Sequence, residues 1–491
     1  MRGARTLSPE TPQTSPVDVD TARIDARNRL VIRLLLVSTF VVILNETIMA
    51  VAIPRLMASL GVTASAAQWL TTAFLLTMAV VIPVTGFLLQ RLHTRQAFVA
   101  AMVLFCSGTL VAALAPGLPV LVAARIIQAS GTAIMFPLLM TTVMQLVPPE
   151  SRGKTMGNIS IVISVAPAVG PTLSGLILNY LSWRWLFILI LPIALGALVL
   201  GIRRIENVTT PRFAPLDSLS VALSAVAFGG SVYGLSLIGV PVEPGGTPFW
   251  VPLGIGSFAM IVFVLRQLRL QRRDGALLDL RTFGSRNFTM SILLMAAMMM
   301  SLFGTVILLP IYLQNVLKLT TLQTGLLLLP GGLLMGLLGP PVGRQYDRVG
   351  PAKLLIPGVA IVTAVLWAMT LMGPETRVAY ILAGHIVMSV GFALLFTPLF
   401  TVSLSSVRPE LYSHGSAVLG SIQQVAGAAG VAVFVALMAA QNTRLAAAGT
   451  GALEALAGGI RAGFFFGAFV ALTAVVFVFF VRKPETSSTS G

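Results

Sequence analysis

Residues 69–95 read WLTTAFLLTMAVVIPVTGFLLQRLHTR, an uncharged run over 69–90 that ends in the basic residues Arg91 and Arg95. A helix needs roughly 20 apolar residues to cross a hydrocarbon core about 30 Å thick. Apolar runs of this length recur along nearly all of the 491 residues. The stretch therefore predicts one membrane-spanning helix, and its recurrence predicts a polytopic membrane protein.

The composition indicates a lipid environment. Apolar residues make up 56% of the chain and charged residues only 10%, whereas soluble domains carry about 25% charged residues. We count fourteen candidate spans, which predict an all-α polytopic membrane protein with both termini on one side. The expected spans are 33–56, 69–90, 97–115, 119–147, 155–180, 184–202, 217–239, 249–267, 288–314, 322–343, 352–373, 378–406, 412–440 and 462–481.

The net charge of +16, from 32 Lys and Arg against 16 Asp and Glu, first suggests a nucleic-acid partner. The positions of the charges exclude that function. With the N-terminus inside, basic residues favour the cytoplasmic tails and loops by about four to one. We therefore expect a multi-pass protein of the plasma (inner) membrane with both termini cytoplasmic. The single cysteine, Cys106, permits neither an internal disulfide nor a cysteine-based metal cluster.

The chain also repeats itself. Residues 86–93 (GFLLQRLH) follow the second span and match residues 343–350 (GRQYDRVG) after the tenth, while Arg125 before Gly131 matches His385 before Gly391. Both matches lie roughly 260 residues apart, which is typical of two six-helix transporter repeats, although chance similarity between Gly-rich apolar stretches is the alternative. The expected division is a disordered cytoplasmic tail (1–30), an N-terminal six-helix bundle (31–203), two inserted linker helices with a cytoplasmic loop (204–285), a C-terminal six-helix bundle (286–482) and a cytoplasmic tail (483–491).

These motifs resemble those of the major facilitator superfamily, specifically its fourteen-span drug:proton antiporter branch of multidrug and lincomycin-type exporters. The resemblance lies in residues 86–95 and 343–353 (the signature loop of each half), 125–131 (the arginine motif), 166–175 (the antiporter motif), 44–54 (the first-helix motif) and 182–192. The chain departs from the family pattern at Gln90, His93, Asn45, Ala129 and Ala166. The resemblance implies the major facilitator fold, with two six-helix bundles and two inserted helices.

Two charged residues lie deep inside predicted spans, and both are candidates for proton coupling. Glu46 is the one acid so placed, and an ionised carboxylate there is costly unless it is protonated, paired or facing water. A protonated carboxyl in a cavity that opens to alternate sides can bind and release a proton; the alternative is a hydrogen bond between helices. Arg125 lies at nearly the same depth, within about 5 Å, so contact is permitted. It would assist proton release, or else hold backbone carbonyls or a buried polar network.

Other side chains are candidates for a substrate cavity or a gate. The cavity candidates are Asn45, Gln128, His385, Gln423, Gln424 and Met298, for which hydrogen bonds between helices or simple packing are the alternatives. The gating candidates are Gly86, Arg91, Gly157, Gly170, Pro171, Gly175, Gly343, Asp347 and Arg348. Glycine and proline let helices approach and bend, with plain packing as the alternative. Asp347 can form charge contacts to helix ends, whereas Gln90 cannot, so we expect a weaker latch in the first half.

Transport is expected to use an ion gradient. Residues 153–155 (GKT) resemble a phosphate loop, but Pro148 stands where that loop requires glycine. We therefore expect no cofactor, no metal and no enzymatic activity. The leading function is a proton-coupled antiporter that exports small amphipathic drugs or metabolites by alternating access, as a monomer in the lipid bilayer with no nucleic-acid partner. The alternatives are a dedicated exporter of a lipid, siderophore or other natural product, and a non-transporting membrane sensor.

Overall fold

All regular structure in the described part of the chain is helical. The computed structural model describes residues 16–207, 211, 216–238 and 246–482, with side chains except at 16–25, 50, 51, 64 and 65. Among these residues, 14 helices are long and apolar enough to cross a membrane, which confirms the predicted fold class. The α-helices are α1 (Pro16–Leu60), α2 (Ala64–Arg91), α3 (Thr94–Leu114), α4 (Leu118–Leu146), α5 (Arg152–Tyr180), α6 (Trp185–Ile188), α7 (Ile190–Arg204), α8 (Ser218–Ser236), α9 (Trp250–Leu270), α10 (Arg286–Ile311), α11 (Thr321–Val349), α12 (Ala352–Met369), α13 (Val378–Ser405), α14 (Tyr412–Ala447) and α15 (Ala452–Val478).

Polar residues set the ends of several helices. Thr320 accepts a hydrogen bond from the Gln323 N–H, and the Gln323 side chain accepts one from the Thr320 N–H, which forms a capping box at the start of α11. Gly350 ends the same helix with φ 79°, a left-handed conformation that glycine adopts without strain. The short 3₁₀ turns η1 (Pro149–Ser151), η2 (Gln271–Arg273), η3 (Leu280–Gly284) and η5 (Pro409–Leu411) and the π-helical turn η4 (Tyr312–Val316) complete the described helices.

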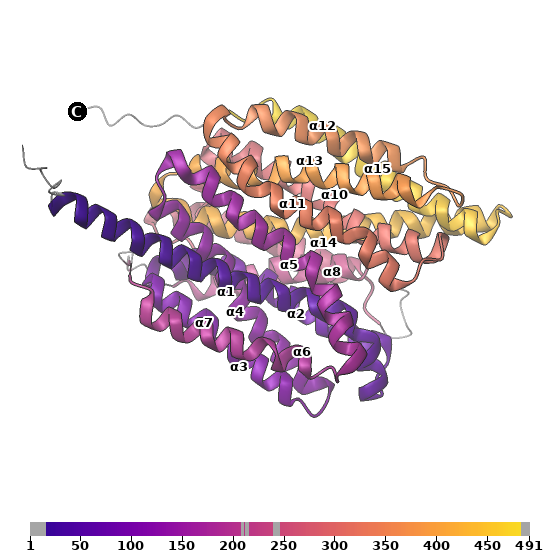
Figure 1. Cartoon of the computed structure of the whole chain (residues 1–491), viewed down its shortest axis with the longest axis horizontal. Coiled ribbons are helices and arrows are strands. Elements are labelled where there is room, and N and C mark those ends of the chain that lie inside the picture. Colours follow the sequence, from indigo (N-terminus) through magenta and orange to yellow (C-terminus); the bar gives the residue numbers. More distant parts are fainter. Residues whose placement is uncertain (1–15, 208–210, 212–215, 239–245, 483–491) are drawn as a thin grey trace, which may run out of the picture.

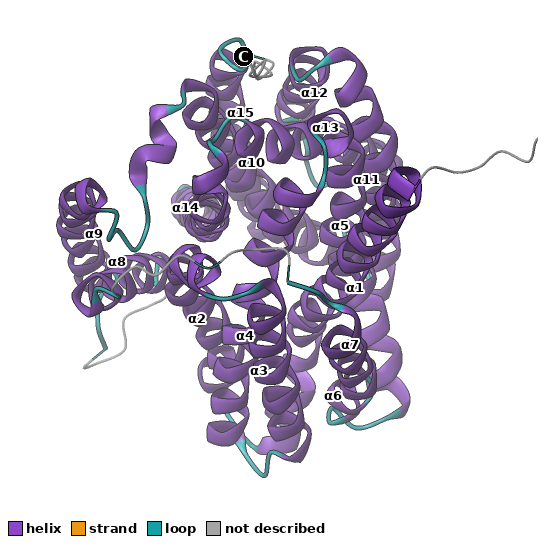
Figure 2. Ribbon diagram, turned by 90° about the vertical axis from the view of Figure 1, so that its left-hand side faces the viewer, coloured by secondary structure: helices purple, strands orange, loops and turns teal. Residues whose placement is uncertain are grey.

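The long helices run side by side, and α1 begins at the same end of the molecule at which α15 ends (Figure 1). We call this the basic end; it carries Arg91, Lys154, Asp347 and Glu410, and the other end is the opposite end. In the end-on view, α1–α7 and α10–α15 form two groups with α8 and α9 to one side (Figure 2). The groups meet where α5 packs on α11 and α13 and where α14 packs on α2 and α4.

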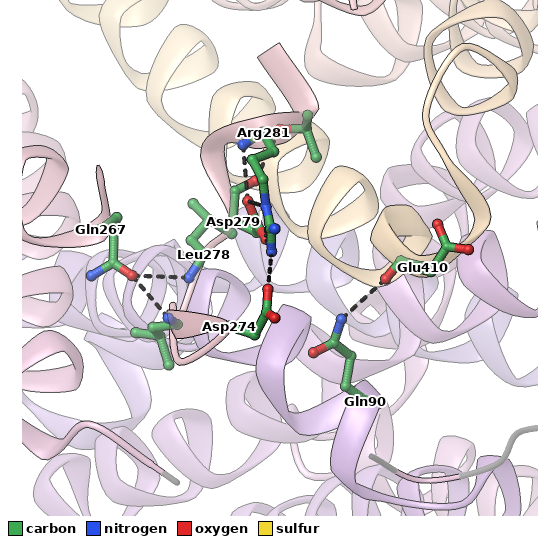
Figure 3. Close-up of polar contacts among 9 residues, drawn as sticks. Gln90, Gln267, Asp274, Leu278, Asp279, Arg281 and Glu410 are labelled. Carbon is green, nitrogen blue, oxygen red and sulfur yellow. Dashed lines mark hydrogen bonds and ion pairs between the residues drawn. The ribbon is translucent and has the colours of Figure 1, made fainter. Parts of the chain in front are cut away.

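Helices α8 and α9 pack on each other, and α8 also packs on α2 and α14. Two atoms of the Arg266 guanidinium donate to the Asp217 carboxylate at 2.7 and 2.8 Å. These hydrogen bonds lower the pKa of Asp217 to about 2. The Gln267 side chain donates to Ser220 and accepts from the Leu277 and Leu278 N–H groups, so it ties the linker after α9 to the α8–α9 pair (Figure 3).

The Asp217–Arg266 pair predicts a pH-dependent contribution to stability. Because folding lowers the Asp217 pKa from 3.8 to about 2, the contribution is present above pH 4 and is lost as the pH falls toward 2. Asp217→Asn is therefore expected to lower the thermal melting temperature of the detergent-solubilised protein at pH 7. The difference between the two proteins should shrink below pH 4, and a difference that grows there would contradict the assignment.

Helices α1, α14 and α15 all extend beyond the spans expected from the sequence. Helix α1 begins at Pro16, so the prediction of disorder for residues 1–30 is wrong from residue 16 onward; residues 1–15 and the predicted tail 483–491 lie outside the described residues. Proline is favoured at the first helical position, and a helix already formed in the membrane extends at little cost. Residues 441–461 are helical except for residues 448–451.

Burial is uneven along the central helices. Near the basic end almost every side chain of residues 131–144 in α4, 391–404 in α13 and 412–421 in α14 is buried. Toward the opposite end the same helices have many partly or fully exposed side chains, as over residues 118–127 and 422–429. The two groups of helices are therefore closed against each other at the basic end.

Candidate functional site

Arg125 of α4 forms the centre of a buried polar network. Its side chain is only 1% exposed. Nη1 donates to the side-chain oxygens of Asn45 and Gln128, both at 3.0 Å, and Nε donates to the Leu70 carbonyl at 3.4 Å. The guanidinium also lies over the Phe74 ring, 4.0 Å from its centroid. Arg125 thus joins α4 to α1 and α2. This agrees with one of its two expected roles, that of holding backbone carbonyls or a buried polar network.

The network continues into α3. Gln128 Nε2 donates to Thr109 Oγ1 at 2.8 Å, and Thr109 donates to the Phe105 carbonyl at 2.6 Å. Gln128 and Asn45, predicted to line a cavity, are almost fully buried and instead hold Arg125 in place. Sequence reasoning missed Thr109 and Phe74, because nothing local separates them from the other threonines and phenylalanines of the spans.

Glu46 lies beside this network without joining it. Its side chain is half-buried and interacts electrostatically with Arg125. No hydrogen bond or ion pair to Glu46 occurs among the residues whose side chains are described. Arg125 takes the neighbouring amide of Asn45 as its partner, so the contact that the sequence permitted is an electrostatic one rather than a direct ion pair.

The neighbours of Glu46 fix its position on α1. Asn45 contacts α4 through Arg125. Thr47 faces α5, where its side chain fills the space in which Gly170 has no side chain. Its hydroxyl lies 3.0 Å from the Leu44 carbonyl of its own helix and 3.5 Å from the Ala166 carbonyl of α5. Successive helical residues point about 100° apart, so Glu46 is held between one residue anchored on α4 and another anchored on α5. This part of α1 is rigidly placed, while the carboxyl itself is left without a partner in the described chain.

The remaining predicted cavity residues do not form one cluster. His385 Nε2 contacts the Leu328 carbonyl at 3.1 Å, and its Nδ1 is buried without a partner in the described chain. Gln423 bonds within its own helix to the Leu419 carbonyl, and Gln424 is partly exposed. Met298 is 0% exposed among core side chains, so the prediction that it lines an open cavity is wrong for this conformation; its flexible thioether fills the core instead.

Glycines let α5 and α11 touch backbone to backbone at the basic end. A Cβ at Gly157 would collide with the Gly339 carbonyl, and a Cβ at Gly343 would collide with the Gly153 carbonyl. Gly86 of α2 similarly makes room for His414 of α14. Gly175 is exposed and has open space around it, so its assignment to this close packing is wrong. Pro171 lies inside α5, whose helix continues through it.

Asp347 at the end of α11 caps the start of α5. Its two carboxylate oxygens accept from the N–H groups of Gly153 and Lys154, both at 2.8 Å. A helix N-terminus favours an anion, and hydrogen bonds to an ionised acceptor are roughly twice as strong as neutral ones. Arg348 is exposed and makes no side-chain hydrogen bond or ion pair within the described residues, whereas Arg91 ends α2 at the same face.

The repeat-related contact in the first half is weaker. Gln90 Nε2 donates to the Glu410 carbonyl at 3.2 Å (Figure 3). This single neutral bond joins α2 to the turn before α14, in place of two charge-assisted bonds to a helix start. The Asp347 contact therefore has two charge-assisted hydrogen bonds where the Gln90 contact has one neutral bond, and the weaker latch in the first half stays a prediction.

Asp347→Asn is expected to weaken closure of the basic end more than Gln90→Ala does. Asparagine keeps one acceptor oxygen but loses the charge at the start of α5, whereas Gln90→Ala removes one neutral hydrogen bond. The measurement is labelling of a cysteine placed at buried Ala417 by a membrane-impermeant maleimide. Greater labelling in the Gln90→Ala protein than in the Asp347→Asn protein would reverse the assigned order.

The described residues contain no group of three or more His, Cys, Asp or Glu side chains placed to hold a metal ion. Cys106 is buried in α3 with a free thiol. The site around Arg125 therefore offers one half-buried carboxyl, that of Glu46, beside a guanidinium held in place. Its other polar contacts join helices.

Sequence comparison decides the family. The family described as Major Facilitator Superfamily matches residues 35–431. The chain belongs to the major facilitator superfamily. This transporter is 39% identical to the uncharacterized MFS-type transporter YcnB of Bacillus subtilis (strain 168) over 93% of its own length and 95% of that protein. It is 38% identical to the lincomycin resistance protein LmrB of the same organism, over 92% and 95% respectively.

A solved structure agrees on the fold of this transporter. The crystal structure of the human organic anion transporter MFSD10 (TETRAN) superposes with a TM-score of 0.66 at 15% sequence identity, over 92% of this chain and 99% of that one. At that identity the likeness concerns the fold alone.

Proposed function

We propose that this transporter is a proton-coupled exporter that exchanges small amphipathic drugs or metabolites for protons by alternating access. The relative named for lincomycin resistance supports a drug-like substrate. The observation that carries the proposal is Glu46, a half-buried carboxyl deep in α1 that has no hydrogen-bond partner among the described side chains. An acid in that position is costly to keep charged and is typical of proton pathways in transporters.

Arg125 favours the ionised form of Glu46 and thereby promotes release of its proton. The guanidinium is held by Asn45, Gln128 and the Leu70 carbonyl, so its position does not depend on the charge of Glu46. When Glu46 is ionised, Arg125 stabilises the carboxylate; when Glu46 is protonated, that electrostatic attraction is lost. Substrate binding and protonation of Glu46 then disfavour each other without excluding each other, which couples export of the substrate to proton entry.

We further propose that the basic end faces the cytoplasm of the plasma membrane, as the positive-inside pattern indicates. The closed contacts at Gly157, Gly343 and Asp347 then describe an outward-facing state. In that state Glu46 takes a proton from the outer side. Residues 31–203 and 286–482 would move as two bundles, with α8 and α9 carried along as the insertion 204–285.

The test uses everted membrane vesicles that contain the protein. Uptake of ethidium, Hoechst 33342 and radiolabelled lincomycin is measured with an imposed gradient, acidic inside. The proposal expects uptake of at least one of these probes, lost when a protonophore collapses the gradient and absent from vesicles without the protein. Uptake that persists after the proton gradient is collapsed would contradict proton coupling.

A further inference from the structure

Two buried hydroxyl pairs cross between the two groups of helices near the basic end. Ser160 of α5 lies 2.6 Å from Thr397 of α13, measured between their hydroxyl oxygens. Thr141 of α4 donates to Ser416 of α14 at 3.2 Å. All four side chains are buried. Buried hydroxyls in an apolar region are costly unless they are paired, so these contacts stabilise the closed conformation in which they form.

In each pair the serine hydroxyl also lies within hydrogen-bond distance of a carbonyl of its own helix. Ser160 also donates to the Met156 carbonyl at 3.2 Å, and Ser416 donates to the Tyr412 carbonyl at 2.8 Å. A hydroxyl has a single hydrogen, so Ser416, which donates to the Tyr412 carbonyl, accepts from Thr141. In the other pair either oxygen can be the donor. In both pairs the serine oxygen lies between the threonine hydroxyl and the carbonyl four residues before that serine.

The two pairs are related by the internal repeat. The threonines lie on α4 and α13, the helices that carry the matching Arg125 and His385, and the serines lie on the next helices, α5 and α14. Phe136 of α4 and Phe400 of α13 meet edge to face between the same two groups, with ring centroids 6.0 Å apart. The closed end thus contains two polar pairs, each between the two groups of helices, and an aromatic contact between α4 and α13.

We propose that Thr141–Ser416 and Thr397–Ser160 are paired gate bonds that hold the transport pathway shut on its basic side, and that all four hydroxyls become accessible together when that end opens. The inference rests on the proposed alternating access and adds the residues that close one side. It differs from the Asp347 latch, because these bonds lie within the spans and join neutral groups.

The first test is disulfide crosslinking in a Cys106→Ala parent, which removes the one native cysteine. The double variants are Ser160→Cys with Thr397→Cys, and Thr141→Cys with Ser416→Cys. Copper–phenanthroline with dissolved oxygen takes two electrons and two protons from each thiol pair to form the S–S bond. Val365→Cys with Gly384→Cys is the control within one group of helices, because a Cβ at Gly384 of α13 lies 3.7 Å from Cγ1 of Val365 in α12.

Each gate pair is expected to crosslink and to stop vesicle uptake of the transported probe, with recovery after reduction by dithiothreitol. The control pair should crosslink without loss of uptake. A gate pair that crosslinks fully while uptake continues would overturn the inference and leave the exporter function standing. Crosslinking of the control alone, with neither gate pair reacting, would also overturn it. If the Cys106→Ala parent and the unmodified protein both fail to transport any probe, the proposed function fails, and the second test still decides the gate.

The second test isolates the hydroxyl group from side-chain shape and needs no transport. Thr397→Val keeps the shape but removes the donor, and Thr397→Ser keeps the donor. The readout is maleimide labelling, from the basic side, of a cysteine at Ala417, which packs against Gly86 across the closed interface. Thr397→Val should raise labelling about threefold, the usual effect of one hydrogen bond between membrane helices, and Thr397→Ser should leave it near the parent level. Equal labelling in the two variants would overturn the inference.

Discussion

Replacing Glu46 with glutamine is expected to reduce proton-driven export to the level of membranes that lack the protein. Glutamine has nearly the same shape as glutamic acid but cannot release a proton, so the variant is fixed in the equivalent of the protonated form. Uphill uptake into everted vesicles measures the loss. Exchange of labelled for unlabelled substrate, which needs no net proton movement, should be retained, because Asn45 and Thr47 still anchor α1 on α4 and α5.

Glu454→Gln is the control for this variant. Glu454 is also an acid, but it pairs with Arg461 at 2.6 Å near the start of α15, at the opposite end of the molecule. Its loss should leave uphill uptake near the wild-type rate. Proton-driven uptake that survives Glu46→Gln would remove Glu46 from the mechanism, whatever the result for the control.

Replacing Gly157 with alanine is expected to produce the second large effect, a loss of export through incomplete closure of the basic end. The added methyl group would meet the Gly339 carbonyl, which is backbone and cannot rotate away. Overpacking of this kind costs about 1–3 kcal/mol, which corresponds to roughly a 5- to 150-fold change in the ratio of two conformations. The closed form should become scarcer by that factor, which is measured by maleimide labelling of a cysteine at Ala417 and by the uptake rate.

Gly175→Ala is the matched control on the same helix. A Cβ at Gly175 meets nothing within 4 Å, so the substitution should leave closure and uptake unchanged. Similar losses in the Gly157 and Gly175 variants would show that α5 needs glycine for its backbone rather than for its approach to α11.

Much of the fold follows from the sequence because hydrocarbon thickness imposes a length on every span. The expected span 97–115 and the helix Thr94–Leu114 differ by only a few residues. The largest errors lie where a helix continues beyond the expected span, as at Pro16 in α1 and Ala452 in α15. Apolar length says where a helix crosses the lipid, whereas polar residues can extend it on either side.

The site was partly predictable, and the reason differs from residue to residue. Glu46 and Arg125 stand out because a charge within a span is rare, and the structure brings Asn45, Arg125 and Gln128 into one network. Thr109 and the hydroxyl pairs were missed, because threonine and serine are common in spans and their partners depend on the register between helices. The same dependence explains Gly175, which lies on α5 like Gly157 but has no other side chain or backbone near its Cβ position.

Proton release on substrate binding tests the coupling by Glu46 most directly. Purified protein in weakly buffered detergent solution receives the probe that the vesicle assay identifies as transported, and a pH indicator records the change. The wild-type protein should release protons when substrate binds, and Glu46→Gln should bind the same substrate without releasing any. Equal proton release from both proteins would contradict Glu46 as the group that couples protons to export.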